Sequence, residues 1–161
     1  MKSTPNDKLT RFIVLFEGRS GSTYFVESLD SHPRIRAEKE LLARLKKDIE
    51  RGRAEPADQL ERVRRLYVAG DHDYDVIGFK TKPKDIMDRE GLAAILREHE
   101  VRVILLQRRN RIKHLVSLVN AMQLNEATGD WNLYDESDRQ PKLRVDIDYC
   151  RNLLANLEKG N

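Results

Sequence analysis

Three short apolar runs, separated by longer charged stretches, set the fold that this sequence predicts. The runs cover residues 12–16 (FIVLF), 75–81 (DVIGFKT) and 101–107 (VRVILLQ), and they are rich in residues that favour strands. Strands that alternate with helices pair in parallel, and right-handed crossovers place the helices on both faces of the sheet. The sequence therefore predicts a three-layer α/β/α domain with a parallel sheet, whose ligands bind at the carboxyl ends of the strands.

Helices are expected between and after these runs. The first covers about residues 22–31 and ends at His32-Pro33, because a residue before proline avoids the helical conformation. The polar stretch 127–141 is expected to be an exposed loop, and residues 1–10 a flexible N-terminus. Further helices are expected at about residues 38–51, 56–68, 111–126 and 146–159, with another between the second and third runs.

Length and composition narrow the class of protein. A chain of 161 residues suits a single domain, residues 1–161, and a charged fraction of 35% beside an apolar fraction of 39% indicates an ordered globular protein. The net charge of +3 is too small to imply a nucleic-acid partner. Cys150 is the only cysteine, which excludes an intrachain disulfide. Because no run is apolar enough for a signal core or a transmembrane segment, a cytoplasmic protein is expected.

The turn after the first apolar run is suited to binding an anion. It reads EGRSGST over residues 17–23, and its two glycines allow the backbone to turn sharply and to approach a ligand closely. The amides that follow lie at a helix N-terminus, where unpaired N–H groups and the helix dipole attract phosphate, while the serines and the arginine add further donors. The candidate nucleotide-binding residues of this turn are Arg19, Ser20, Gly21, Ser22, Thr23 and Tyr24.

This turn departs from the phosphate loop of nucleoside triphosphatases. That loop follows the pattern G-x-x-x-x-G-K-[ST], whereas Ser22 follows Gly21 here. A kinase or triphosphatase would use the lysine on its phosphates and would depend on magnesium, so this interpretation is weakened. A generic Gly/Ser turn between a strand and a helix stays open as an alternative for the loop taken alone.

A second basic element follows the third apolar run. Residues 107–114 carry four basic side chains and no acid, although basic residues at a helix N-terminus are unfavourable with the helix dipole unless an anion is bound. Arg109 could fork onto a phosphate, and Ser117, eight positions later, could reach back from the helix with its hydroxyl. The alternative is a solvated helix start with an ordinary helical serine.

Together these two elements resemble the nucleotide-binding motifs of sulfotransferases, especially the bacterial and carbohydrate types. RSGST from Arg19, closing at His32-Pro33, is similar to their 5′-phosphosulfate loop, and the spacing of Arg109 and Ser117 is similar to their 3′-phosphate motif. The resemblance implies the sulfotransferase variant of the P-loop-containing nucleoside triphosphate hydrolase-like fold. It also implies 3′-phosphoadenosine 5′-phosphosulfate (PAPS) as donor, no metal, and a hydroxyl acceptor on a carbohydrate, lipid or small molecule.

The resemblance also assigns roles to candidate catalytic residues. Arg19 occupies the position of the family's catalytic lysine or arginine. Relatives place a glutamate shortly after the His-Pro, which suggests Glu40, in preference to Glu38, as the base. Lys80, at the end of the second apolar run, is expected on the ligand edge together with Lys82, just after the run, and could touch sulfate or acceptor. The alternatives are a solvated glutamate at a helix start and a surface lysine with a packed stem.

Two further expectations concern the length of the chain relative to sulfotransferases and an acidic cluster at residues 71–75. Relatives usually continue past residues 146–159 with another strand and a nucleotide-covering segment, so the resemblance suggests a minimal or truncated member. A catalytically impaired nucleotide-binding module is therefore the main alternative to an active enzyme. The acidic cluster DHDYD, residues 71–75, precedes a strand and is interpreted as a solvated loop, because it lies at the opposite end of a parallel sheet from the predicted site.

Overall fold

A computed structural model of the protein describes residues 9–68, 74–133, 137 and 145–159. The chain divides into two compact units, Met1–Gln107 and Arg108–Asn161, and each is described by itself. The first unit contains the sheet, and the second contains two helices.

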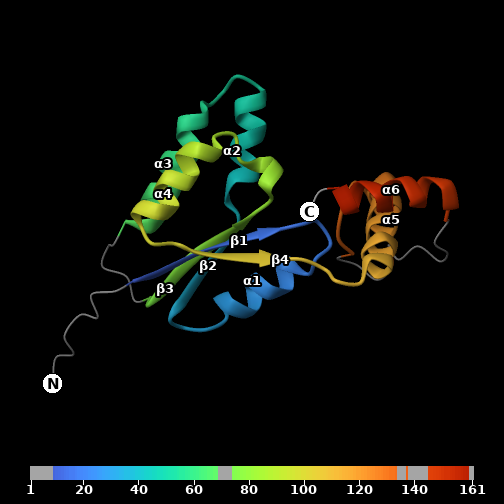
Figure 1. The fold of residues 1–161 in the computed structure, drawn as a ribbon, viewed down its shortest axis with the longest axis horizontal. Coiled ribbons are helices and arrows are strands. Elements are labelled where there is room, and N and C mark those ends of the chain that lie inside the picture. Colours follow the sequence, from blue (N-terminus) through green and yellow to red (C-terminus); the bar gives the residue numbers. More distant parts are fainter. Residues whose placement is uncertain (1–8, 69–73, 134–136, 138–144, 160–161) are drawn as a thin grey trace. The chain divides into compact units, whose positions relative to one another are not determined.

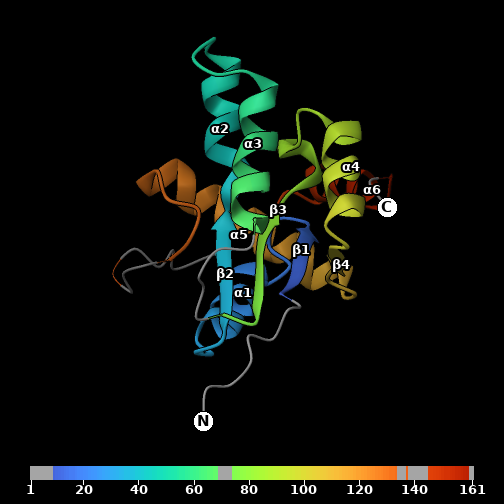
Figure 2. The same cartoon turned by 90° about the vertical axis from the view of Figure 1, so that its left-hand side faces the viewer.

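The first unit is built on a parallel four-stranded sheet with the order β2-β3-β1-β4 (Figures 1 and 2). The predicted α/β class with a parallel sheet is therefore confirmed. The strand that precedes the glycine-containing turn is one of the two inner strands, so the turn lies away from both side edges of the sheet. The strands are β1 (Thr10–Phe16), β2 (Ile35–Glu40), β3 (Val76–Thr81) and β4 (Arg102–Leu106).

Helices cover both faces of this sheet (Figure 1). Side chains alternate along β1, so Phe12 and Val14 pack with Val26 of the first helix, while Ile13 packs on the other face. This arrangement is compatible with the predicted three-layer fold. The helices of this unit are α1 (Ser22–Asp30) on one face, and α2 (Leu41–Glu50), α3 (Pro56–Tyr67) and α4 (Arg89–Glu98) on the other, with a short 3₁₀ turn η1 (Pro83–Asp85).

One element was predicted wrongly from the sequence. The expected helix at 38–51 begins only at Leu41, and the residues before it form the edge strand β2, IRAEKE. Only Ile35 and Ala37 of this strand are apolar, and both pack under α1, while charged residues alternate with them. An edge strand tolerates such charge because one of its sides is unpaired, so its sequence lacks the apolar pattern of a buried strand. In addition, β1 begins at Thr10 rather than at residue 12.

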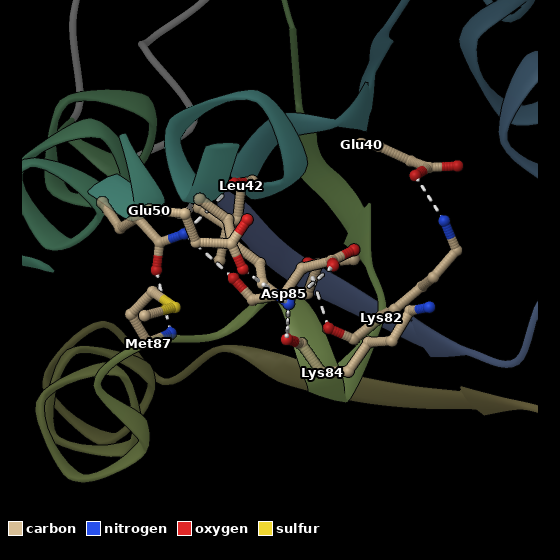
Figure 3. Close-up of polar contacts among 10 residues, drawn as sticks. Glu40, Leu42, Glu50, Lys82, Lys84, Asp85 and Met87 are labelled. Atoms are coloured by element: carbon tan, nitrogen blue, oxygen red, sulfur yellow. Dashed lines mark hydrogen bonds and ion pairs between the residues drawn. The ribbon is translucent and has the colours of Figure 1, made fainter. Parts of the chain in front are cut away.

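A buried glutamine ties together the segments that follow two of the strands. The Gln59 side-chain amide donates to the carbonyls of Leu42, at 3.1 Å, and of Asp85, at 2.9 Å. Its oxygen accepts from the amide of Met87 at 3.0 Å (Figure 3 shows these three partners). The start of α2 and the η1 turn are thereby held to α3. This matters for the site because Glu40 and Lys82 immediately precede these two segments.

The second unit consists of helices α5 (Arg111–Thr128) and α6 (Ile147–Lys159), as predicted to within two residues at each end. The Asn110 side chain caps α5 by accepting from the amide of Lys113 at 2.8 Å, and Gly129 ends the helix in the left-handed conformation. Residues 129–133 are exposed, and of the remaining part of the predicted loop only Ser137 belongs to the described residues. Among the described residues, no helix is both long and apolar enough to cross a bilayer.

The close approach of β3 to β1 generates a stability prediction. A Cβ atom placed on Gly78 would lie 2.3 Å from the carbonyl oxygen of Phe12, its partner in register. Gly78→Ala should therefore force the two strands apart and lower the free energy of unfolding by about 1–3 kcal/mol, measured by urea unfolding. Gly18→Ala is the matched control, because its added methyl group meets nothing within 4 Å. Equal stability of the two variants would contradict this packing.

Candidate functional site

The connections of β1 and β3 leave the sheet toward opposite faces. β1 is followed by α1 on one face, and its neighbour β3 is followed by η1 and α4 on the other. In open parallel sheets, ligands bind outside the carboxyl ends of strands at such a switch point. The turn after β1 and the lysine-bearing end of β3 meet here.

The backbone of the turn adopts an unusual conformation. Arg19 has a φ of 65° and Gly21 a φ of 87°, so both lie in the left-handed region, where a residue with a side chain costs about 1–2 kcal/mol. The turn is closed by the amide of Ser20, which donates to the Glu17 carbonyl at 3.2 Å. Strain of this kind is often found where a backbone is held for a ligand.

The N-terminus of α1 differs from that of α4 in its capping. It has no side-chain cap and no acidic residue in its first turn, whereas α4 is capped by Asp88. The first amides of a helix have no partner within the helix itself. Next to them in the sequence, the hydroxyl of Ser20 is buried and has no hydrogen-bond partner among the described residues. An oxyanion at this position would satisfy both the amides and the hydroxyl.

Lys80 reaches from β3 to this same turn. Its ammonium group donates to the Thr23 hydroxyl at 2.9 Å and to the Ser22 hydroxyl at 3.3 Å, and it lies 4.9 Å from the centre of the Phe16 ring. The side chain is only 2% exposed, so the alternative of a surface lysine is wrong. Burial lowers the pKa of Lys80, the nearby Lys82 lowers it further, and Glu40 partly opposes the shift.

Glu40 lies beside two lysines at the end of β2. Its Oε2 accepts from the Lys82 ammonium at 2.7 Å, and its Oε1 lies 3.9 Å from the Lys80 ammonium. Figure 3 shows the side chain of Lys82 directed toward the Glu40 carboxylate. The other candidate base, Glu38, instead accepts from Arg36 of its own strand at 2.7 Å. The structure therefore places Glu40, rather than Glu38, beside these lysines.

The remaining predicted site residues are distributed as follows. Ser22 is buried at the start of α1, while Tyr24 is 79% exposed. Arg109 and Ser117 belong to the second unit, where Arg109 is exposed just before α5 and Ser117 lies on α5 itself. The contacts of the first unit thus bring together four predicted residues: Ser22, Thr23, Glu40 and Lys80.

The acidic cluster at residues 71–75 falls mainly outside the described residues. Its last member, Asp75, accepts hydrogen bonds from the Arg34 guanidinium, which lower the pKa of this carboxyl group. Asp75 immediately precedes β3 and so lies at the end of the strand opposite to Lys80. In the described parts of the chain, no group of three His, Cys, Asp or Glu side chains is arranged to hold a metal ion.

Sequence reasoning did not identify the part played by Phe16 or the pairing of Lys82 with Glu40. The ring of Phe16 underlies both ammonium groups, with the Lys82 nitrogen 5.4 Å from its centre. A signal was present for the lysines, because residues two apart at a strand end share one face. No comparable signal identified Phe16, since its contact depends on the pairing of β1 with β3.

Comparison of the sequence with protein-family models and with curated proteins finds no match to either. The function of the protein is therefore inferred from the chemistry of the residues at this site. Two ammonium groups, uncapped helix amides and buried hydroxyls can bind an oxyanion, and the adjacent carboxylate can accept a proton.

The lowered pKa of Lys80 generates a prediction about stability. Since the unfolded chain holds this proton more tightly than the folded one, stability rises with pH between the two pKa values. Lys80→Met removes the buried charge, so the variant should unfold a few degrees higher than wild type near neutral pH. Its advantage should shrink as the pH rises toward the ordinary lysine pKa.

Thermal unfolding at a series of pH values measures both effects. Lys47→Met, which replaces an exposed lysine of α2, should show neither. A Lys80→Met variant that is clearly less stable than wild type at neutral pH would mean that this lysine serves the fold rather than a ligand.

Proposed function

We propose that this protein binds 3′-phosphoadenosine 5′-phosphosulfate and transfers its sulfuryl group to a hydroxyl of an acceptor, which is a carbohydrate, lipid or small molecule. The observation that carries the proposal is the buried ammonium of Lys80, held by the hydroxyls of Ser22 and Thr23 at the start of α1. A fixed cation at an uncapped helix N-terminus suits a phosphosulfate group.

In this proposal, the turn after β1 holds the 5′-phosphosulfate end of the donor. The first amides of α1 and the Ser20 hydroxyl, which has no hydrogen-bond partner within the described part of the chain, donate to its oxygens. Arg109 and Ser117 recognise the 3′-phosphate, as the resemblance to sulfotransferases implies.

The donor supplies an activated sulfuryl group, and the side chains of the site move protons and stabilise charge. Glu40 takes the proton from the acceptor hydroxyl as its oxygen forms a bond to sulfur. Arg19 and Lys80 stabilise the negative charge that develops as the bond between sulfur and the bridging oxygen breaks. Adenosine 3′,5′-bisphosphate leaves with that oxygen. Glu40 is 36% exposed, so an acceptor can approach it from solvent.

The two alternatives make different predictions. A nucleoside kinase or triphosphatase would prefer ATP and depend on magnesium. An impaired nucleotide-binding module would bind the bisphosphate but transfer no sulfate.

Nucleotide preference is the first test. Thermal shift assays should show that adenosine 3′,5′-bisphosphate stabilises the protein more than ATP does, because only the former carries a 3′-phosphate for Arg109 and Ser117. Arg109→Ala should remove this preference. Arg97→Ala, in the last turn of α4, is the control and should keep it. Stabilisation by ATP alone would overturn the proposal.

Sulfate transfer is the second test. Radiolabelled donor should label at least one acceptor in a panel of sugars, lipids and phenols, without added magnesium. Arg19→Ala should lower kcat/KM by about 10²–10³-fold, because it removes one cation from the developing charge. Binding of the bisphosphate with no transfer to any acceptor would favour the impaired module.

A further inference from the structure

Glu40 and the two lysines form a single charge cluster. The carboxylate binds Lys82 directly, at 2.7 Å, and has Lys80 at 3.9 Å, while the Phe16 ring lies beneath both ammonium groups. The three side chains carry a net charge of +1 when all are ionised. The cluster is thus only partly neutralised by its own acid.

Burial differs among the three members. Lys80 is 2% exposed, Lys82 is 26% exposed, and Glu40 is 36% exposed. Lys80 is fixed by its hydroxyl partners on α1, whereas no side-chain partner besides Lys82 and Lys80 holds the Glu40 carboxylate in the described residues. The Glu40 carboxylate is therefore the member of the cluster that another anion can displace most easily.

An oxyanion at the start of α1 needs the same ammonium groups that Glu40 now neutralises. Lys80 already contacts the turn, and Lys82 lies on the same strand end and over the same ring. An incoming anion and the Glu40 carboxylate repel each other and compete for these cations. Lys80 and Lys82 therefore cannot fully neutralise the ligand and the Glu40 carboxylate at the same time.

We propose that Glu40 is a built-in counter-ion, which an oxyanion ligand displaces from Lys82 and Lys80, so that anion binding itself frees the carboxylate. Lys82 is then a positioning residue that holds Glu40 until the ligand arrives. The proposal deepens the proposed function, on which it rests for the identity of the natural ligand. In that setting, the base becomes available only when the donor is in place.

Inorganic sulfate is the first probe, because its binding does not depend on nucleotide recognition. Calorimetry on the full chain should show sulfate binding about 10-fold more tightly to Glu40→Gln than to wild type. Glu38→Gln is the matched control: it removes a carboxylate from the same strand that pairs with Arg36 instead, and it should change the affinity less than about 3-fold. In a Lys82→Met background, the gain from Glu40→Gln should fall below about 3-fold.

Carboxyl labelling of the wild-type protein provides a second measurement that needs no variant. Carbodiimide modification, measured by mass spectrometry, should label Glu40 faster when sulfate is bound, while the labelling rate of Glu38 should not change. A ligand that merely covered the site would slow the labelling of Glu40.

The outcomes separate the two proposals. Unchanged or weaker sulfate binding by a folded Glu40→Gln variant, or slower labelling of Glu40, would overturn the counter-ion role. Tighter sulfate binding without preference for the bisphosphate over ATP would support the counter-ion role and overturn the proposed donor.

Discussion

The buried ammonium of Lys80 is the interaction on which the arrangement of the site depends. Removing a charge from water is unfavourable unless partners compensate for the lost hydration. Here the partners come from three other places in the chain: the Phe16 ring at the end of β1, the hydroxyls at the start of α1, and Glu40 at the end of β2. One side chain thus links the carboxyl ends of three strands.

The sheet order explains why these groups meet. β3 lies between β1 and β2, so the end of β3 is adjacent to the turn on one side and to Glu40 on the other. The register places Lys80 beside Val14 of β1 and Glu40 of β2. Gln59 then fixes the segments that follow β2 and β3 from the opposite face. The charge cluster is therefore supported by elements that contribute no charge to it.

The sequence predicted the periodic elements better than the contacts between them. The apolar runs that became β1, β3 and β4 were evident, as was the glycine-containing turn after β1, because local pattern determines both. The edge strand β2 was missed because its many charged residues obscure the alternation of apolar and polar residues that is typical of a strand. Without β2, the pairing of Glu40 with Lys82, 42 residues later, had no geometric basis. The burial of Lys80 likewise depends on neighbours that only the tertiary structure brings together.

The position of Lys80 also weakens the inference, drawn from the sequence of the turn, that the ligand is a phosphosulfate rather than a triphosphate. Ser22 stands where a triphosphatase has its lysine, which weakened the interpretation of the turn as a triphosphate-binding loop. Yet the Lys80 ammonium lies within 3.3 Å of the Ser22 hydroxyl, so a neighbouring strand supplies a cation at the same helix start. The turn alone therefore discriminates less between triphosphate and phosphosulfate than its sequence implied. The distinction between a triphosphate and a phosphosulfate ligand therefore rests on Arg109 and Ser117, whose spacing is the specific argument for a 3′-phosphate.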